Sequence, residues 1–201
     1  QNVTVQNSNF AGNNKIGGLL AHDAECTSMI IDNCHVLNCD IRSTHKTDGG
    51  NVGGLLGYFQ GQSNNEHKIT NSSVKESTII AINSKNSGHR SNGQFVGCLS
   101  GKDNQILVIE DCVIEGNDFS QTINGTDPVT YVSPYGVFVG GNRNDDGKGT
   151  VIVDNQNVAG TAEELAYLVN NAKKDITIAL TADLEGKITL YQKEGVKVTI
   201  D

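Results

Sequence analysis

The chain has 201 residues, a formal net charge of −8 and a hydrophobic fraction of 36%, which is low for a compact globular domain of this length. Its 15 Lys and Arg residues are scattered, whereas binding to a phosphate backbone needs clustered basic residues, so nucleic acid is excluded as a partner. No run of about 18 apolar residues occurs, so no helix of this chain is expected to span a membrane.

Three short patterns recur along residues 1–160 and indicate internal repeats. An apolar-x-Asn/Asp-x-x-apolar pattern starts at Val5, Ile31, Ile69, Ile109 and Val153. A Gly-rich pattern starts at Ile16, Val52, Val96 and Val139. In the middle three repeats a third apolar residue (Ile41, Ile79 and Phe119) follows ten positions after the first. Segments this short that alternate apolar and polar residues indicate strands rather than helices.

These repeats predict an all-β fold, a right-handed parallel β-helix (β-solenoid) with one coil per repeat, because only stacked coils would satisfy the backbone and bury the apolar face. We expect one buried column of Ile31, Ile69, Ile109 and Val153, and a second of Val36, Val74, Ile114 and Val158. A column of Asn7, Asn33, Asn71, Asp111 and Asn155 is expected at a tight turn. The Gly-Gly pairs are expected at a corner packed closely against the adjacent coil.

The pattern changes in residues 161–201, which we treat as a second region. Thr161 and Glu164 form a capping box, and the apolar spacing that follows predicts an amphipathic helix over 162–173. Three alternating segments come next, around Ile176/Ile178/Leu180, Ile188/Leu190 and Val196/Val198/Ile200. We expect this region to cover the edge of the last coil and to begin a further module beyond Asp201.

The five cysteines are odd in number and include no C-x-x-C pair, so neither a disulfide framework nor a zinc-ligand spacing is predicted. They are interpreted as small apolar residues of the core. Cys34 and Cys112 are expected in one column with Ser72 between them, too far apart to form a disulfide.

A search for site residues predicts no catalytic, cofactor-binding or metal-binding residue. The outward positions beside the Asn column are Gln6, Asp32, Thr70, Glu110 and Asp154. Asp32 and Glu110 would lie about 10 Å apart from the strand spacing, without a matched partner for glycosidase chemistry. The segment 142–149 resembles half of a calcium loop, but Val153 replaces the acidic twelfth ligand, and a turn would need the same composition. The five histidines (His22, His35, His45, His67 and His89) lack paired spacing and are expected at the surface.

The segments that start at Ile16, Val52 and Val96, each followed by Ile-x-Asn/Asp-Cys/Ser-x-Val, resemble the repeats of GLUG-motif proteins. Two departures from that pattern are Cys98 in place of the second Gly and Asn142 in place of Leu. Residues 161–201 are similar to the opening of a pectin-lyase-like β-helix. The resemblance to GLUG-motif proteins covers residues 1–160. It implies a large bacterial surface protein of the adhesin-like kind, in which the repeats form a scaffold attached to other functions.

Two functions are therefore kept open. The first is a non-enzymatic, monomeric structural or adhesive module, extracellular or on the bacterial cell surface, whose partners would be host or matrix glycans or proteins. The second is part of a carbohydrate-active β-helix protein, a polysaccharide lyase, a glycosidase or a polysaccharide-binding module. The catalytic part of that alternative would lie outside this chain or would use the inserts 43–51 and 119–135, where Tyr131 and Tyr135 are the plausible sugar-stacking pair. Because the chain opens with a strand-like segment at Gln1–Thr4, we expect it to begin after export processing or within a longer protein.

Overall fold

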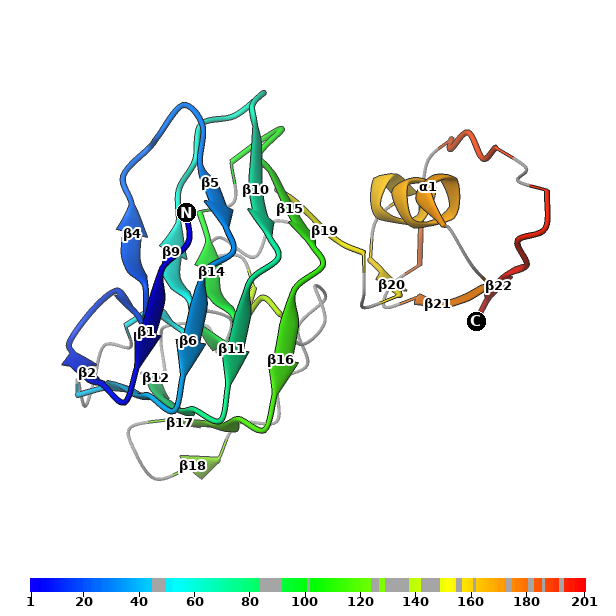
Figure 1. Ribbon diagram of the computed structural model, residues 1–201. Coiled ribbons are helices and arrows are strands. Elements are labelled where there is room, and N and C mark those ends of the chain that lie inside the picture. Colours follow the sequence, from blue (N-terminus) through cyan, green and yellow to red (C-terminus); the bar gives the residue numbers. More distant parts are fainter. Residues whose placement is uncertain are drawn as a thin grey trace.

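The protein is mostly β-strand with one short helix, in a computed structural model that describes residues 1–44, 50–83, 92–100, 102–123, 127–128, 138–141, 149–154, 157–160, 162–172, 175–180, 183–185, 187–191 and 194–201 (Figure 1). In the first 154 residues, nearly all strand pairing is parallel and joins segments from successive repeats. The predicted all-β class is therefore confirmed.

Five sheets each take one strand from successive repeats. We call the repeats units 1 to 4, and the strands of each sheet are given below in the order of their units. The first sheet contains β1 (Thr4–Gln6), β6 (His35–Leu37), β11 (Ser73–Lys75) and β16 (Val113–Glu115). The second contains β2 (Asn9–Gly12), β7 (Asp40–Ser43), β12 (Thr78–Asn83) and β17 (Asp118–Ile123), with β18 (Asp127–Pro128) antiparallel to β17. The third contains β3 (Ile16–Gly17), β8 (Val52–Gly53) and β13 (Asn92–Gly93). The fourth contains β4 (Leu20–Asp23), β9 (Leu56–Phe59) and β14 (Val96–Leu99). The fifth contains β5 (Ile30–Asp32), β10 (Glu66–Thr70), β15 (Ile106–Glu110) and β19 (Thr150–Val153).

The register confirms the predicted Ile31 column, and it confirms the predicted Val36 column for Val36, Val74 and Ile114. In the fifth sheet Ile31, Ile69, Ile109 and Val153 lie opposite one another, and each is at most 6% exposed. In the first sheet Val74 pairs with Val36 and Ile114, and in the second Ile79 pairs with Ile41 and Phe119. The same register places Ser72 between Cys34 and Cys112. These columns form one continuous apolar core.

The predicted alignment of the first repeat with the later ones is wrong. Val5 lies opposite Val36 in the first sheet, not in the Ile31 column. The residue beside Asn33 is accordingly Asn2, whose Oδ1 accepts a hydrogen bond from Asn33 Nδ2 at 2.8 Å. Asn7 belongs to a second corner, where Asn38 Nδ2 donates to its Oδ1 at 2.8 Å.

Both corners hold their residue in the left-handed region, as predicted for a turn that favours Asn. The first corner has Asn2, Asn33, Asn71 and Asp111 at φ between 51° and 58°, and the second has Asn7, Asn38, Glu76 and Gly116 at φ between 49° and 65°. Asn155, which was expected in the first column, lies outside the described residues.

The Gly-rich corner packs closely against neighbouring backbone, as predicted. A Cβ on Gly53 would overlap Leu56 O and lie 2.5 Å from Gly97 N of the next unit. The register of the third copy was wrong, however, because Val52-Gly53 pairs with Asn92-Gly93 and not with Val96-Gly97. Val96 instead pairs with Leu56, so Cys98 is not a replacement for the second Gly.

The C-terminal region contains α1 (Ala162–Asn171) and a parallel sheet of β20 (Val158–Ala159), β21 (Ile176–Leu180) and β22 (Val198–Ile200). The helix agrees with the predicted 162–173. Val158 pairs with Ala179 and is not in the Val36 column, and the described residues around Ile188 and Leu190 form no strand. Ala159, Leu165, Leu168, Val169 and Ile178 form a separate small core. The predicted N-cap Thr161 lies outside the described residues.

Candidate functional site

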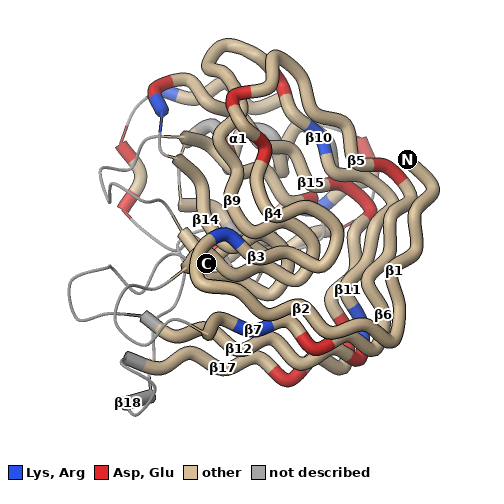
Figure 2. The backbone as a smooth tube through the Cα atoms, turned by 90° about the vertical axis from the view of Figure 1, so that its left-hand side faces the viewer, with Lys and Arg blue, Asp and Glu red and all other residues tan. Residues whose placement is uncertain are grey.

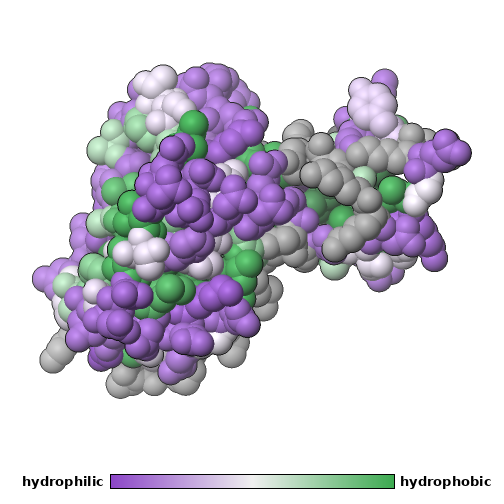
Figure 3. Space-filling model, viewed as in Figure 1, coloured by the Kyte–Doolittle hydropathy of each residue, from purple (hydrophilic) through white to green (hydrophobic). Residues whose placement is uncertain are grey.

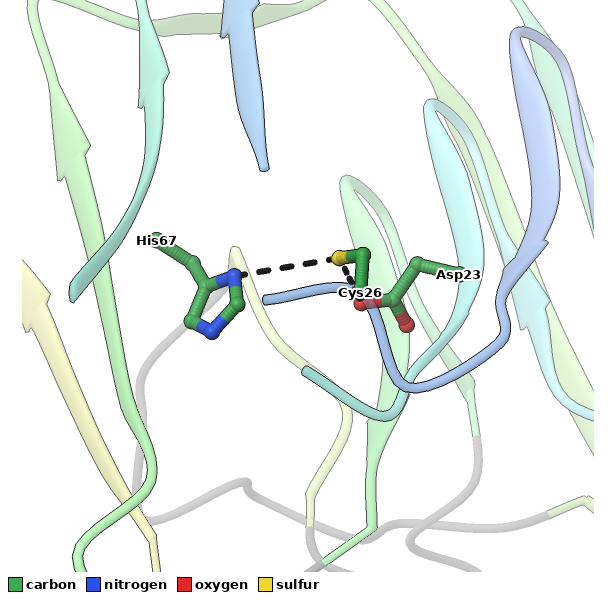
Figure 4. Close-up of side chains that lie close together, drawn as sticks. All are labelled: Asp23, Cys26 and His67. Atoms are coloured by element: carbon green, nitrogen blue, oxygen red, sulfur yellow. Dashed lines mark hydrogen bonds between the residues drawn. The ribbon is translucent and has the colours of Figure 1, made fainter. Parts of the chain in front are cut away.

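Three side chains that ligate metals in proteins converge where unit 1 meets unit 2 (Figure 4). Asp23 is the last residue of β4, Cys26 lies in the connection to β5, and His67 is the second residue of β10. One oxygen, sulfur or nitrogen atom of each lies within 4.8 Å of the other two. Among the described residues this is the one group of its kind.

Asp23 and His67 occupy positions at which the other units have apolar side chains. Asp23 lies opposite Phe59, which in turn lies opposite Leu99. His67 lies opposite Leu107. Asp23 is 6% exposed and His67 is completely buried. Polar residues at inward positions of an otherwise apolar column break the repeat pattern, and such exceptions concentrate at functional sites.

The ring of His67 is held in one orientation. Its Nε2 lies 3.2 Å from the carbonyl oxygen of Gln62, and the ring packs edge-on against Phe59 with centroids 5.0 Å apart. Because a carbonyl oxygen can only accept, the contact with Gln62 requires a proton on Nε2. The other ring nitrogen, Nδ1, faces Cys26 Sγ, 3.9 Å away (Figure 4).

The carboxylate of Asp23 is also fixed by backbone. Its Oδ1 accepts a hydrogen bond from the N–H of Gln60 in unit 2, and its Oδ2 accepts one from the thiol of Cys26 at 3.2 Å. Burial raises the pKa of the Asp23 carboxyl. The hydrogen bonds from Gln60 and Cys26 and the charges of His67 and His22 lower this pKa, but by less than burial raises it. The pKa of the Cys26 thiol is raised to about 11, and burial is the largest cause. The hydrogen bond to Asp23 and the negative charge of Asp23 raise this pKa further.

A Cys, a His and an Asp could in principle form a nucleophilic triad, but this arrangement lacks its order of contacts. In a triad the acid orients the imidazole, which in turn takes the proton of the nucleophile. Here the acid contacts the thiol, and the far nitrogen of His67 faces a backbone carbonyl. A thiol with a pKa of about 11 is protonated at neutral pH and therefore a weak nucleophile. The donor set of one S, one N and one O suits a borderline-soft divalent cation better.

The outward acids singled out in the sequence serve the stack itself. Asp32, Thr70 and Glu110 are in register, as predicted. Asp32 Oδ1 accepts hydrogen bonds from Thr70 Oγ1 at 2.7 Å and from Asn71 Nδ2 at 2.9 Å. Both hydrogen bonds lower the pKa of the Asp32 carboxyl, and the one from Asn71 has the larger effect. Asp154 Oδ1 accepts the N–H of Asp111 at 3.1 Å. Gln6 lies opposite Leu37 and is not in this row.

Several other predicted features fall wholly or partly outside the described residues. These are residues 142–148 of the calcium-like segment, most of the two inserts, and Tyr131, Tyr135, His45 and His89. Val153, the twelfth position of that segment, is a buried residue of β19. His22 and His35 are partly exposed, with ring nitrogens 2.8 Å from Gln60 Oε1 and 2.9 Å from Ser73 Oγ.

The expectation that His67 is a surface residue was wrong, and the Asp23–Cys26–His67 group was missed. Cys26 and His67 are 41 positions apart, which matches no local metal motif. A signal was present in the repeats, because aligning 20–23 with 56–59 and 96–99 places Asp23 against Phe59 and Leu99. The incorrect register of the third Gly-rich copy hid only Leu99, because the first two copies are aligned as predicted.

Comparison with known proteins finds no matching family model, no matching curated protein and no matching solved structure. Within the described ranges, no helix is both long and apolar enough to cross a membrane.

Proposed function

We propose that this chain is a non-enzymatic structural or adhesive module, secreted or displayed on a bacterial surface, and built as a right-handed parallel β-helix. The GLUG-like repeats imply the location and the kind of protein. The parallel, in-register pairing of successive units supports the β-helix, since each unit alone leaves its backbone groups and apolar residues uncovered.

The non-enzymatic assignment rests on the hydrogen bonds that the Asp32 carboxylate accepts. A glycosidase needs one free carboxylate facing another across the sugar. Both hydrogen bonds to Asp32 Oδ1 come from Thr70 and Asn71 of the adjacent unit, so this carboxylate ties the corner of unit 1 to that of unit 2. Asp154 accepts a hydrogen bond from the backbone N–H of Asp111 in unit 3. Asp32 and Asp154 are thus part of the scaffold.

The outer surface supports contacts with polar partners. Viewed along the stack, acidic residues lie on the strands of the first, second and fifth sheets (Figure 2), and Glu66, Glu115 and Asp118 among them are exposed. The face seen in Figure 3 mixes polar with apolar residues. Ion pairs such as Lys75–Glu115, at 2.8 Å, lie on the outer surface and stabilise little because both partners are solvated. Glycans or proteins of a host or matrix are the partners we propose for such a surface.

Location and activity can be tested separately. Mild trypsin treatment of intact cells that produce the protein should cleave or release it while a cytoplasmic marker stays intact. Protection of the chain until the cells are lysed would contradict surface display.

For activity, the purified chain should generate neither new reducing ends nor unsaturated uronates from neutral and acidic polysaccharides. Products that disappear in Asp32→Asn or Glu110→Gln, with the melting temperature unchanged, would instead establish the carbohydrate-active alternative.

A further inference from the structure

We infer that Asp23, Cys26 and His67 form a zinc site that joins unit 1 to unit 2. The inference does not depend on the proposed function, because it concerns a ligand of the scaffold and not its partners. The three donors would be Asp23 Oδ2, Cys26 Sγ and His67 Nδ1.

The observed separations fit tetrahedral zinc. With Zn–S about 2.3 Å and Zn–N or Zn–O about 2.0–2.1 Å, two ligand atoms of a tetrahedral site lie about 3.3–3.6 Å apart. The sulfur of Cys26 lies 3.2 Å from Asp23 Oδ2 and 3.9 Å from His67 Nδ1. Both separations from Cys26 are therefore within a few tenths of an ångström of these values, and the donor atoms of Asp23 and His67 lie within 4.8 Å of each other. The donor set also disfavours Ca²⁺ and Mg²⁺, because both ions prefer oxygen ligands to a thiolate and an imidazole.

The groups around the three donors have the arrangement that orients metal ligands. The ligating nitrogen of a metal-bound His is usually fixed by a hydrogen bond from the other ring nitrogen to a carbonyl or carboxylate. His67 Nε2 has this bond, to Gln62 O at 3.2 Å. The free oxygen of a ligating carboxylate is commonly hydrogen-bonded too, and Asp23 Oδ1 accepts the N–H of Gln60. Both supports come from the connection that follows β9.

Burial distinguishes this group from an ordinary surface cluster. His67 is fully buried and Asp23 is 6% exposed, at positions where units 2 and 3 have Phe59, Leu99 and Leu107. A buried carboxylate beside a buried imidazole costs free energy that apolar residues at the same positions would not. A bound cation would offset that cost. Cys26 is partly exposed, so the fourth zinc ligand would be a water molecule that enters from this side.

The site can be tested on the whole chain with Co²⁺ as a spectroscopic probe and Zn²⁺ as competitor. Metal-depleted, reduced protein should bind one equivalent of Co²⁺ with visible bands of tetrahedral intensity and a sulfur-to-cobalt charge-transfer band, and Zn²⁺ should remove both. Zinc at 100-fold above its Kd should raise the melting temperature by about 5–10 °C.

Three variants separate metal binding from folding. His67→Leu introduces the residue that unit 3 has at this position, so it should fold as well as the parent and lose the zinc-dependent rise. Cys26→Ser should lose the charge-transfer band, and Asp23→Asn should weaken binding at least 10-fold.

The matched control is Cys34→Ser, because Ser72 already occupies the same column; it should keep full cobalt and zinc binding. Substoichiometric cobalt binding, a spectrum without the sulfur band, or equal binding by the parent, Cys26→Ser and His67→Leu would overturn the assignment. Equal loss of binding in Cys34→Ser would overturn it as well.

Discussion

Ser72 Oγ accepts a hydrogen bond from the backbone N–H of Cys34 at 3.0 Å, which links unit 2 to unit 1 through a buried side chain. The same hydroxyl donates to its own chain, to Thr70 O at 2.7 Å. Ser77 repeats the device one corner later, accepting from the N–H of Cys39 at 3.1 Å and donating to Lys75 O at 2.8 Å. The left-handed residues Asn71 and Glu76 are thus each followed by a buried serine that completes a backbone hydrogen bond of the preceding unit.

Ser72→Ala should therefore lower the free energy of unfolding by about 1–3 kcal/mol, because the N–H of Cys34 would be left buried without its acceptor. Urea unfolding followed by circular dichroism would measure this. Ser120→Ala, at an exposed position of β17, is the matched control and should stay within about 0.5 kcal/mol of the parent. Equal stability of the two variants would contradict the role assigned to Ser72.

Cys112 should make the protein sensitive to alkaline pH. Burial is the first cause that raises the pKa of its thiol to about 12, from the ordinary value of 9.0. Above pH 9 the unfolded chain can lose this proton while the folded chain retains it, so stability falls as pH rises toward 12. The slope from this group is at most about 1.4 kcal/mol per pH unit.

Unfolding free energies measured from pH 8 to pH 11 should thus decline less steeply for Cys112→Ser than for the parent. Other groups titrate over this range in both proteins, so the difference between the two curves isolates the thiol. Parallel curves would contradict the prediction.

Ile69→Asp should unfold the stack cooperatively. Ile69 is fully buried between Ile31 and Ile109, and an unpaired carboxylate there would cost several kcal/mol. Ile30→Asp places the same charge in the neighbouring column, where the side chain is 58% exposed, and should leave the melting temperature nearly unchanged. Thermal unfolding followed by circular dichroism compares the two; similar melting curves would mean that the fifth sheet has a different register.

Gly53→Ala should destabilise the protein far more than Gly12→Ala. A Cβ at Gly53 would overlap the carbonyl oxygen of Leu56, which is backbone and cannot move aside. At Gly12 the nearest atom would be Cγ1 of Ile16 at 3.2 Å, on a side chain that can adjust. Overpacking of a tight site costs about 1–3 kcal/mol, and backbone overlap places Gly53 at the upper end. Chemical denaturation of both variants is the measurement, and equal midpoints would argue against close packing at this corner.

The columns of the middle units could be predicted because their apolar residues recur at fixed distances from an Asn or Asp corner. The errors have a physical origin. Each unit has two left-handed corners five residues apart, for example Asn33 and Asn38, so a short pattern can match either one. The Gly-rich segment likewise has Gly53 and Gly57 four residues apart, which allowed Val96-Gly97 to be aligned with the wrong pair. The alignment of units 1 and 2 places Asp23 opposite Phe59, but no local spacing relates Cys26 to His67, which lies 41 positions later, so spacing alone could not predict the group.

Glu164 connects the C-terminal region to the end of the stack. It is 2% exposed, and its two carboxylate oxygens accept hydrogen bonds from the N–H of Gly160 at 2.8 Å and from the N–H of Val151 at 3.3 Å. The reach toward residues before the helix was expected from the capping box. The bond to Val151 was not, and it covers part of the edge of β19, the last strand of the fifth sheet.

Glu164→Gln should therefore destabilise both the helix and the edge it covers. The amide nitrogen cannot accept a hydrogen bond, so one of the two backbone N–H groups loses its partner, at a cost of about 1.5–3 kcal/mol for a bond to a charged group. Glu185→Gln, at an exposed position, makes the same chemical change without that loss and should behave as the parent in urea unfolding. Deletion of residues 161–201 should go further, leaving the edge of β19 open to pairing with a second molecule, so light scattering should detect self-association. A truncated chain that stays monomeric and equally stable would contradict the capping role of this region.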